Sequence, residues 1–111
     1  MDNKSNRKFK SGAVRDTDEG KENYLDSISW PSLKRYSLYQ NAAANKHSYP
    51  LGNWKLGIPI EEYEKSLMRH LQKYLSNKYD GTNIEPNVDH LAAAWFNLQG
   101  IIHEEEKLKN K

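Results

Sequence analysis

Apolar side chains recur at intervals of three and four residues in three separate stretches of the chain, a spacing typical of amphipathic helices. We expect helices over 31–46, 60–78 and 88–107. Pro31 suits the first turn of the first helix, and Asn87 is a good N-cap for the third. No segment alternates apolar and polar residues as a half-buried strand does. The predicted fold class is therefore all-α.

Two segments outside these helices lack a helical pattern. Residues 1–23 are mostly charged or polar, which by composition alone predicts an extended arm. Residues 48–59 contain two prolines and two glycines, so we expect an ordered or mobile loop between the first two helices. Residues 24–111, which include this loop, are predicted to form a single helical domain.

The composition limits the classes of protein to which the chain can belong. Its 111 residues suffice for one modest domain, and no apolar run approaches the roughly 20 residues of a membrane span or the pattern of a signal peptide. Cysteine is absent, which excludes disulfides and thiolate catalysis and fits a reducing cytoplasm. The net charge of +2 is too small to indicate a nucleic-acid-binding protein. We therefore expect a soluble cytoplasmic protein without nucleic-acid or membrane partners, and the wide apolar face of the third helix predicts a homo-oligomer.

Polar side chains in the second and third predicted helices are candidates for a binding pocket. His70 follows Tyr63 by seven residues, which turns it toward the apolar stripe, and His90 and Asn97 share a face of the third helix. If these helices pack antiparallel, the three polar residues could line one pocket, and Arg69 would favour an anion there. A histidine on an apolar stripe is equally well explained as a hydrogen-bonded core residue.

Acidic and aromatic residues give further candidates, each with a simpler explanation. Glu61 and Glu64 have a spacing that can hold Mg²⁺, although two glutamates in a first helical turn are usually solvated. Asp89 is placed to favour the helix dipole first and to bind a ligand second. Trp54 in the loop could stack on a base or clamp the loop to the core.

Several landmarks, in this order along nearly the whole chain, resemble the amino-terminal domain of the dATP/dGTP diphosphohydrolase family, which is common in bacteriophages. The landmarks are Phe9-Lys-Ser-Gly-Ala-Val-Arg-Asp16, Gly20-Lys21, Gly52-Asn-Trp-Lys-Leu-Gly-Ile-Pro59, Arg69-His-Leu71, and Asp89-His-Leu-Ala-Ala-Ala94 with Asn97.

The resemblance implies a small helical protein that handles purine nucleotides and cleaves dATP or dGTP to the monophosphate and pyrophosphate, as the all-helical pyrophosphatases related to MazG do. That reaction needs Mg²⁺ held by carboxylates. Those enzymes pair E-x-x-E with E-x-x-D on the next helix. This chain offers Glu61 and Glu64 but only Asp89 for the second pair, so a single-metal or metal-free pocket is equally plausible.

The resemblance also implies that the arm docks on the helices and belongs to the binding site. Arg15 and Lys21 would then reach phosphates and Asp16 a ribose or base. The ligand-binding residues expected from the landmarks are Arg15, Asp16, Lys21, Asn53, Trp54, Arg69, His70, His90 and Asn97.

Two functions lead at this point, with hydrolysis first, and an interaction protein without a small ligand is a third possibility. One is hydrolysis of a purine deoxynucleoside triphosphate with Glu61, Glu64 and Asp89 as catalytic Mg²⁺ ligands. The other is a phage-encoded sponge that binds a host defence nucleotide without cleaving it, in the host cytoplasm. The broken carboxylate pattern favours the sponge, and the family's activity favours the enzyme.

Overall fold

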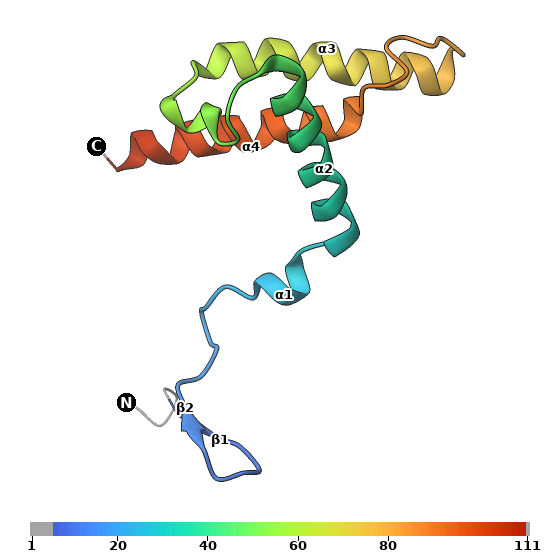
Figure 1. Cartoon of the computed structure of the whole chain (residues 1–111). Coiled ribbons are helices and arrows are strands. Elements are labelled where there is room, and N and C mark those ends of the chain that lie inside the picture. Colours follow the sequence, from blue (N-terminus) through green and yellow to red (C-terminus); the bar gives the residue numbers. More distant parts are fainter. Residues whose placement is uncertain (1–5, 111) are drawn as a thin grey trace.

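A computed structural model describes residues 6–110 and confirms the all-α class (Figure 1). The three long helices begin and end within two residues of the predicted positions. In chain order the elements are β1 (Arg7–Lys8), β2 (Val14–Arg15), α1 (Tyr24–Ser27), α2 (Trp30–His47), the 3-10 helix η2 (Asn53–Leu56), α3 (Ile60–Tyr79) and α4 (His90–Lys109).

Helices α3 and α4 form an antiparallel pair that holds most of the core. Tyr63 of α3 is only 2% exposed and lies against Phe96, with 5.8 Å between ring centroids. Gly100 allows this close approach, because a Cβ at that position would overlap the Tyr63 ring. Small residues on α4 therefore bring the two helices together around one buried aromatic side chain.

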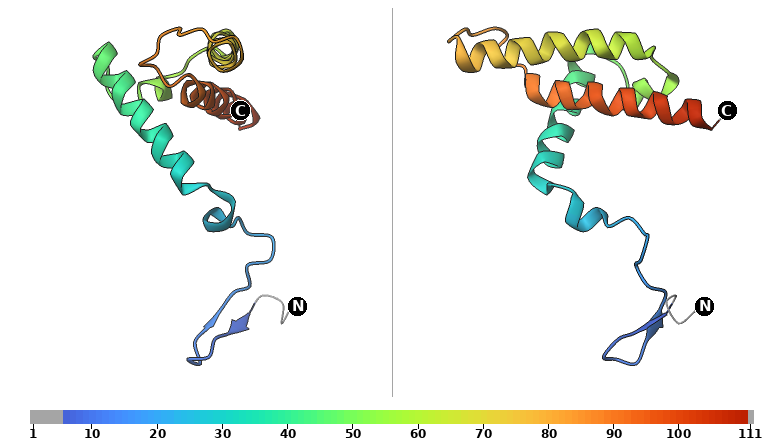
Figure 2. Two further views of the ribbon diagram at one scale, coloured as in Figure 1. Left: turned by 90° about the vertical axis from the view of Figure 1, so that its right-hand side faces the viewer. Right: turned by 180° about the vertical axis from the view of Figure 1, so that it is seen from behind.

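Helix α2 crosses α4 on a different side from α3 (Figure 2). Ser29 caps its first turn by accepting a hydrogen bond from the Ser32 backbone N–H, and Pro31 lies in that turn as predicted. Tyr36 packs on Trp95 with 5.1 Å between ring centroids. Because α2 and α3 flank α4 together, the alanines at 92–94 are almost fully buried.

The start of α4 differs from the prediction. Asp89, and not Asn87, is the N-cap, because its Oδ1 accepts a hydrogen bond from the Ala92 backbone N–H at 3.1 Å. The helix consequently begins at His90, two residues later than expected. This shift leaves Asn87 and Val88 outside α4, where they line a cleft.

The glycine- and proline-containing loop between α2 and α3 contains a 3-10 helix that packs on α4, which matches the ordered form of the two that the sequence allowed. Its 3-10 helix η2 lies on the second half of α4, where Trp54 meets His103 edge to face with 4.8 Å between ring centroids. The Ile58 backbone N–H donates to Glu104 at 3.4 Å. The loop is therefore anchored to α4 at both ends of η2.

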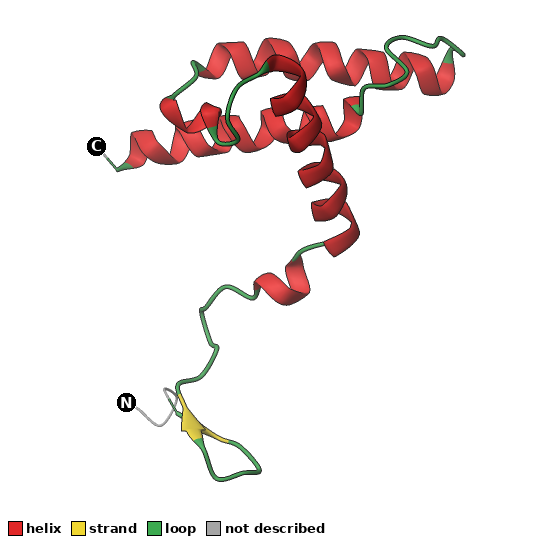
Figure 3. Cartoon of the chain, in the orientation of Figure 1, coloured by secondary structure: helices red, strands yellow, loops and turns green. Residues whose placement is uncertain are grey.

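The arm contains a short antiparallel hairpin that the sequence pattern did not predict (Figure 3). Gly12, with φ of 97°, forms the turn, and an Arg7–Asp18 ion pair of 2.8 Å braces the segment that follows. The hairpin lies away from α3 and α4 in Figure 1. Docking of the arm on the helices stays a prediction, and residues 1–5 lie outside the described part of the chain.

Among residues 6–110, no helix is both long enough and apolar enough to cross a membrane.

Candidate functional site

A cleft of about 690 Å³ lies between α2, the middle of α3 and the segment that leads into α4. This volume is in the range of pockets that hold small organic ligands. Its basic and histidine side chains are Lys34, Arg35, Lys46, His47, His70 and Lys73. Its acidic side chains are Glu85 and Asp89, and its apolar surface comes from Pro31, Leu38, Tyr39, Ala42, Ala43 and Val88.

The two carboxylates of the cleft are both held by cations. Arg35 donates to both oxygens of Asp89, from Nε at 2.6 Å and from Nη2 at 2.8 Å. Lys73 donates to Glu85 at 2.7 Å. The hydrogen bond from Arg35 lowers the pKa of Asp89, and that from Lys73 lowers the pKa of Glu85. Both acids are therefore ionised at pH 7, and the charge of each is balanced by its cationic partner.

Two lysines add positive charge that no carboxylate of the described chain offsets. Lys34 and Lys46 both line the cleft, and neither forms an ion pair within residues 6–110. Since the other two cations are already paired, these lysines give the cleft an excess of positive charge. An anionic ligand is the chemistry that this excess favours.

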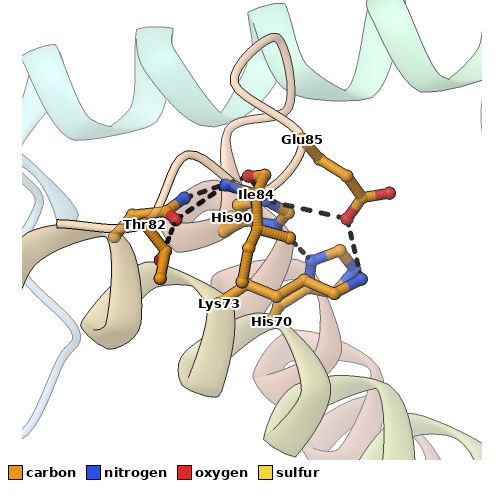
Figure 4. A network of polar contacts seen from close by, with 7 residues as sticks. His70, Lys73, Thr82, Ile84, Glu85 and His90 are labelled. Carbon is orange, nitrogen blue, oxygen red and sulfur yellow. Dashed lines mark hydrogen bonds and ion pairs between the residues drawn. The ribbon is translucent and has the colours of Figure 1, made fainter. Parts of the chain in front are cut away.

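His70 lines the cleft and contacts the buried His90, and Figure 4 shows this histidine pair with its polar neighbours. His70 and His90 approach through their Nδ1 atoms at 2.9 Å, and Nε2 of His90 lies 3.2 Å from the Ile84 carbonyl oxygen. Asn77 clamps the same segment, since it donates to that carbonyl and accepts from the Ile84 backbone N–H. Burial and the neighbouring His90 lower the pKa of His70.

The structure brings three of the predicted site residues together. His70 and Asp89 line the cleft, and the buried His90 is the direct partner of His70. Arg69 is exposed and does not line the cleft. Asn97 is buried and donates to the Ala93 carbonyl oxygen one helical turn earlier at 2.8 Å, so it satisfies its own helix.

The predicted Mg²⁺ ligands do not converge within one chain. Glu61 and Glu64 are exposed in the first two turns of α3, and Glu61 lies 3.4 Å from Lys65. His70 contacts His90 and therefore lies level with the start of α4, where Asp89 is the N-cap. Glu64 precedes His70 by six residues, so it lies roughly 9 Å away from that level along the axis of α3. No three of the described His, Asp and Glu side chains are grouped to hold a metal ion. The donor set of Glu61, Glu64 and Asp89 therefore does not fit a Mg²⁺ site in the single described chain.

The remaining predicted residues lie outside the cleft. Arg15 is in strand β2, and Asp16 and Lys21 follow it in the arm. Asn53 and Trp54 belong to η2 on the far half of α4, where Trp54 clamps the loop. Their contribution to a ligand site stays a prediction.

Sequence reasoning missed the basic residues of α2. It used this helix only for its core-facing stripe. The sequence nevertheless indicates a second face of this helix. The residues on it recur at intervals of three and four, with a basic residue at each end: Arg35, Leu38, Ala42 and Lys46. That face forms one wall of the cleft.

Comparison with known proteins identifies the family. A family model described as dATP/dGTP diphosphohydrolase, N-terminal, matches residues 11–111, which include every cleft residue. Neither the curated proteins nor the solved structures include a match to the chain. The family match supports a nucleotide-handling role.

Proposed function

From the premise that the chain belongs to the dATP/dGTP diphosphohydrolase N-terminal family, we propose that the cleft beside α2 binds a purine deoxynucleoside triphosphate. The observation that carries this proposal is the excess of positive charge from Lys34 and Lys46 in a cleft of nucleotide size. A triphosphate supplies the matching negative charge.

The two kinds of surface in the cleft suit the two ends of a nucleotide. Lys34 and Lys46 would bind phosphate oxygens, with Arg35 and Lys73 available at the cost of loosening their carboxylate partners. Tyr39 offers an aromatic face against which a purine can stack. Asn87 adds an amide that both donates and accepts hydrogen bonds.

Binding without cleavage is the function that this geometry supports best. The carboxylates in the cleft are held by Arg35 and Lys73, and the expected Mg²⁺ ligands lie apart. A protein of this kind lowers the free concentration of its nucleotide, as a phage-encoded sponge against a host defence signal would. In this proposal the side chains of the cleft bind and orient the phosphates. Among the described residues they do not form a metal site that would activate a water molecule for attack on the phosphates.

Hydrolysis to the monophosphate and pyrophosphate is the second candidate, and the family description favours it. It requires Mg²⁺ held by carboxylates, with Glu61, Glu64 and Asp89 as the proposed set. Because one chain keeps these acids apart, the set would have to be completed by rearrangement or by a second chain.

One experiment separates the two candidates. The protein is incubated with dGTP or dATP and Mg²⁺ at high protein concentration, denatured, and the nucleotide is identified by chromatography and mass spectrometry. Recovery of intact triphosphate bound in stoichiometric amount supports sequestration. Recovery of monophosphate and pyrophosphate supports the enzyme, and dCTP serves as the control for purine selectivity.

We also propose that the protein is a homo-oligomer. Leu98 and Ile102 of α4 are about half exposed, at 48% and 59%. A second copy covering this face would remove apolar surface that the single chain leaves in water.

A further inference from the structure

The hydrogen bonds of the histidine pair define which ring nitrogens carry protons. The Ile84 carbonyl oxygen can only accept, so Nε2 of His90 donates to it. In its neutral form His90 then has a bare Nδ1. The proton between the two Nδ1 atoms, which lie 2.9 Å apart, must therefore belong to His70. Neutral His70 is left with an unprotonated Nε2, for which no residue among 6–110 provides a hydrogen bond.

This arrangement can accept one more proton at only one of its two histidines. A second proton between the two Nδ1 atoms would set two N–H groups against each other across 2.9 Å and break the bond between the rings. A proton on Nε2 of His70 breaks no existing hydrogen bond. The pair therefore behaves as a single site whose added proton resides on His70.

The charges around His70 decide when that proton binds. The groups that face the cleft or His70 are His90 and Asp89 at the start of α4, Glu85 in the preceding turn, Arg69 and Lys73 on α3, and Lys34, Arg35, Lys46 and His47 on α2. Without a ligand, burial and the basic neighbours lower the pKa of His70. A phosphate beside the ring would reverse the local field and favour the protonated form.

We propose that binding of a polyphosphate in the cleft is coupled to uptake of one proton at Nε2 of His70, and that His90 is the positioning residue that reserves this atom. The inference rests on the proposed function, because it needs phosphate in the cleft. His70 then adds a charged N–H donor to the lysines only when the ligand is present. The consequence is an affinity that rises as the pH falls.

Proton uptake can be counted by isothermal titration calorimetry of dGTP and of inorganic tripolyphosphate, in buffers with different ionisation heats at pH 7. The wild-type protein is expected to take up more protons than His70→Gln, with a difference approaching one. Comparison with this variant cancels the titration of the ligand's own phosphate. As the pH rises, the affinity of both proteins can change through the ligand's own phosphate. For one coupled proton, the wild type should lose up to about tenfold more affinity per pH unit than the variant.

Three further variants make the test specific. His90→Gln should reduce the proton count while circular dichroism shows intact helices, and if it does not fold, His70→Gln alone decides. His103→Gln, outside the cleft, should leave the count unchanged. A count lowered by His47→Gln but not by His70→Gln would overturn the assignment, as would equal counts in the wild type and His70→Gln. Absence of binding at any pH would instead refute the proposed function and this inference with it.

Discussion

Asp89 holds two structural roles that substitution can separate. It caps α4 through the Ala92 backbone N–H, and it forms the two-pronged ion pair with Arg35 that joins α4 to α2. Asparagine keeps a good capping oxygen but removes the charge, whereas alanine removes both. The loss of stability in Asp89→Asn therefore measures the ion pair, and the further loss in Asp89→Ala measures the cap.

The structure gives the expected magnitudes. Loss of a capping side chain costs about 1 kcal/mol of stability. The Arg35 side chain is 57% exposed, so solvent screening limits the ion pair to less than about 1 kcal/mol. We expect Asp89→Ala to lower the free energy of unfolding by about 1–2 kcal/mol and Asp89→Asn by less than half of that.

Urea unfolding followed by circular dichroism at pH 7 measures both values, and Asn87→Ala is the matched control. Asn87 would be the cap if α4 began where the sequence pattern placed it, and in this structure its substitution should change stability by less than about 0.5 kcal/mol. A larger effect at Asn87 than at Asp89 would refute the capping argument. Because the pKa of Asp89 is lowered, its contribution is present above the unfolded pKa, and the difference between wild type and Asp89→Ala should shrink as the pH falls through the folded pKa.

Three other substitutions test the packing, the cleft and the surface. Gly100→Ala should destabilise the protein by about 1–2 kcal/mol, because the added methyl group overlaps Tyr63 and overpacking outweighs the better helix propensity of alanine; a higher unfolding midpoint would contradict this. Lys46→Ala should weaken dGTP binding by about tenfold or more in calorimetry, since a charge-assisted hydrogen bond is lost, and unchanged affinity would place the phosphates elsewhere. Leu98→Glu should lower the mass measured by light scattering to that of the monomer with helicity retained, whereas an unchanged mass would place the interface on another face.

The long helices could be predicted because their apolar periodicity and their flanking prolines agree. The start of α4 could not, because Asn87 and Asp89 are both good capping residues. In the structure Asp89 also pairs with Arg35, which is 54 residues away, and local sequence does not reveal such a contact. The arm hairpin was missed because its strands have only two residues each, too few to show an alternating pattern.

The candidate site was predictable only in part. His70 and Asp89 were found because their chemistry stands out within their own helices. The lysines of α2 were missed because their role depends on the angle at which α2 crosses α4, a tertiary property that periodicity does not encode. Glu61 and Glu64 have a spacing that suits a metal, but spacing within one helix does not determine what lies opposite it.

The central claim is that the cleft beside α2 binds a purine deoxynucleoside triphosphate. A crystal structure of the protein with dGTP tests it most directly. We predict the phosphates beside Lys34 and Lys46, with His70 within hydrogen-bonding distance. A nucleotide bound through Mg²⁺ at Glu61 and Glu64, with the cleft empty, would contradict the account.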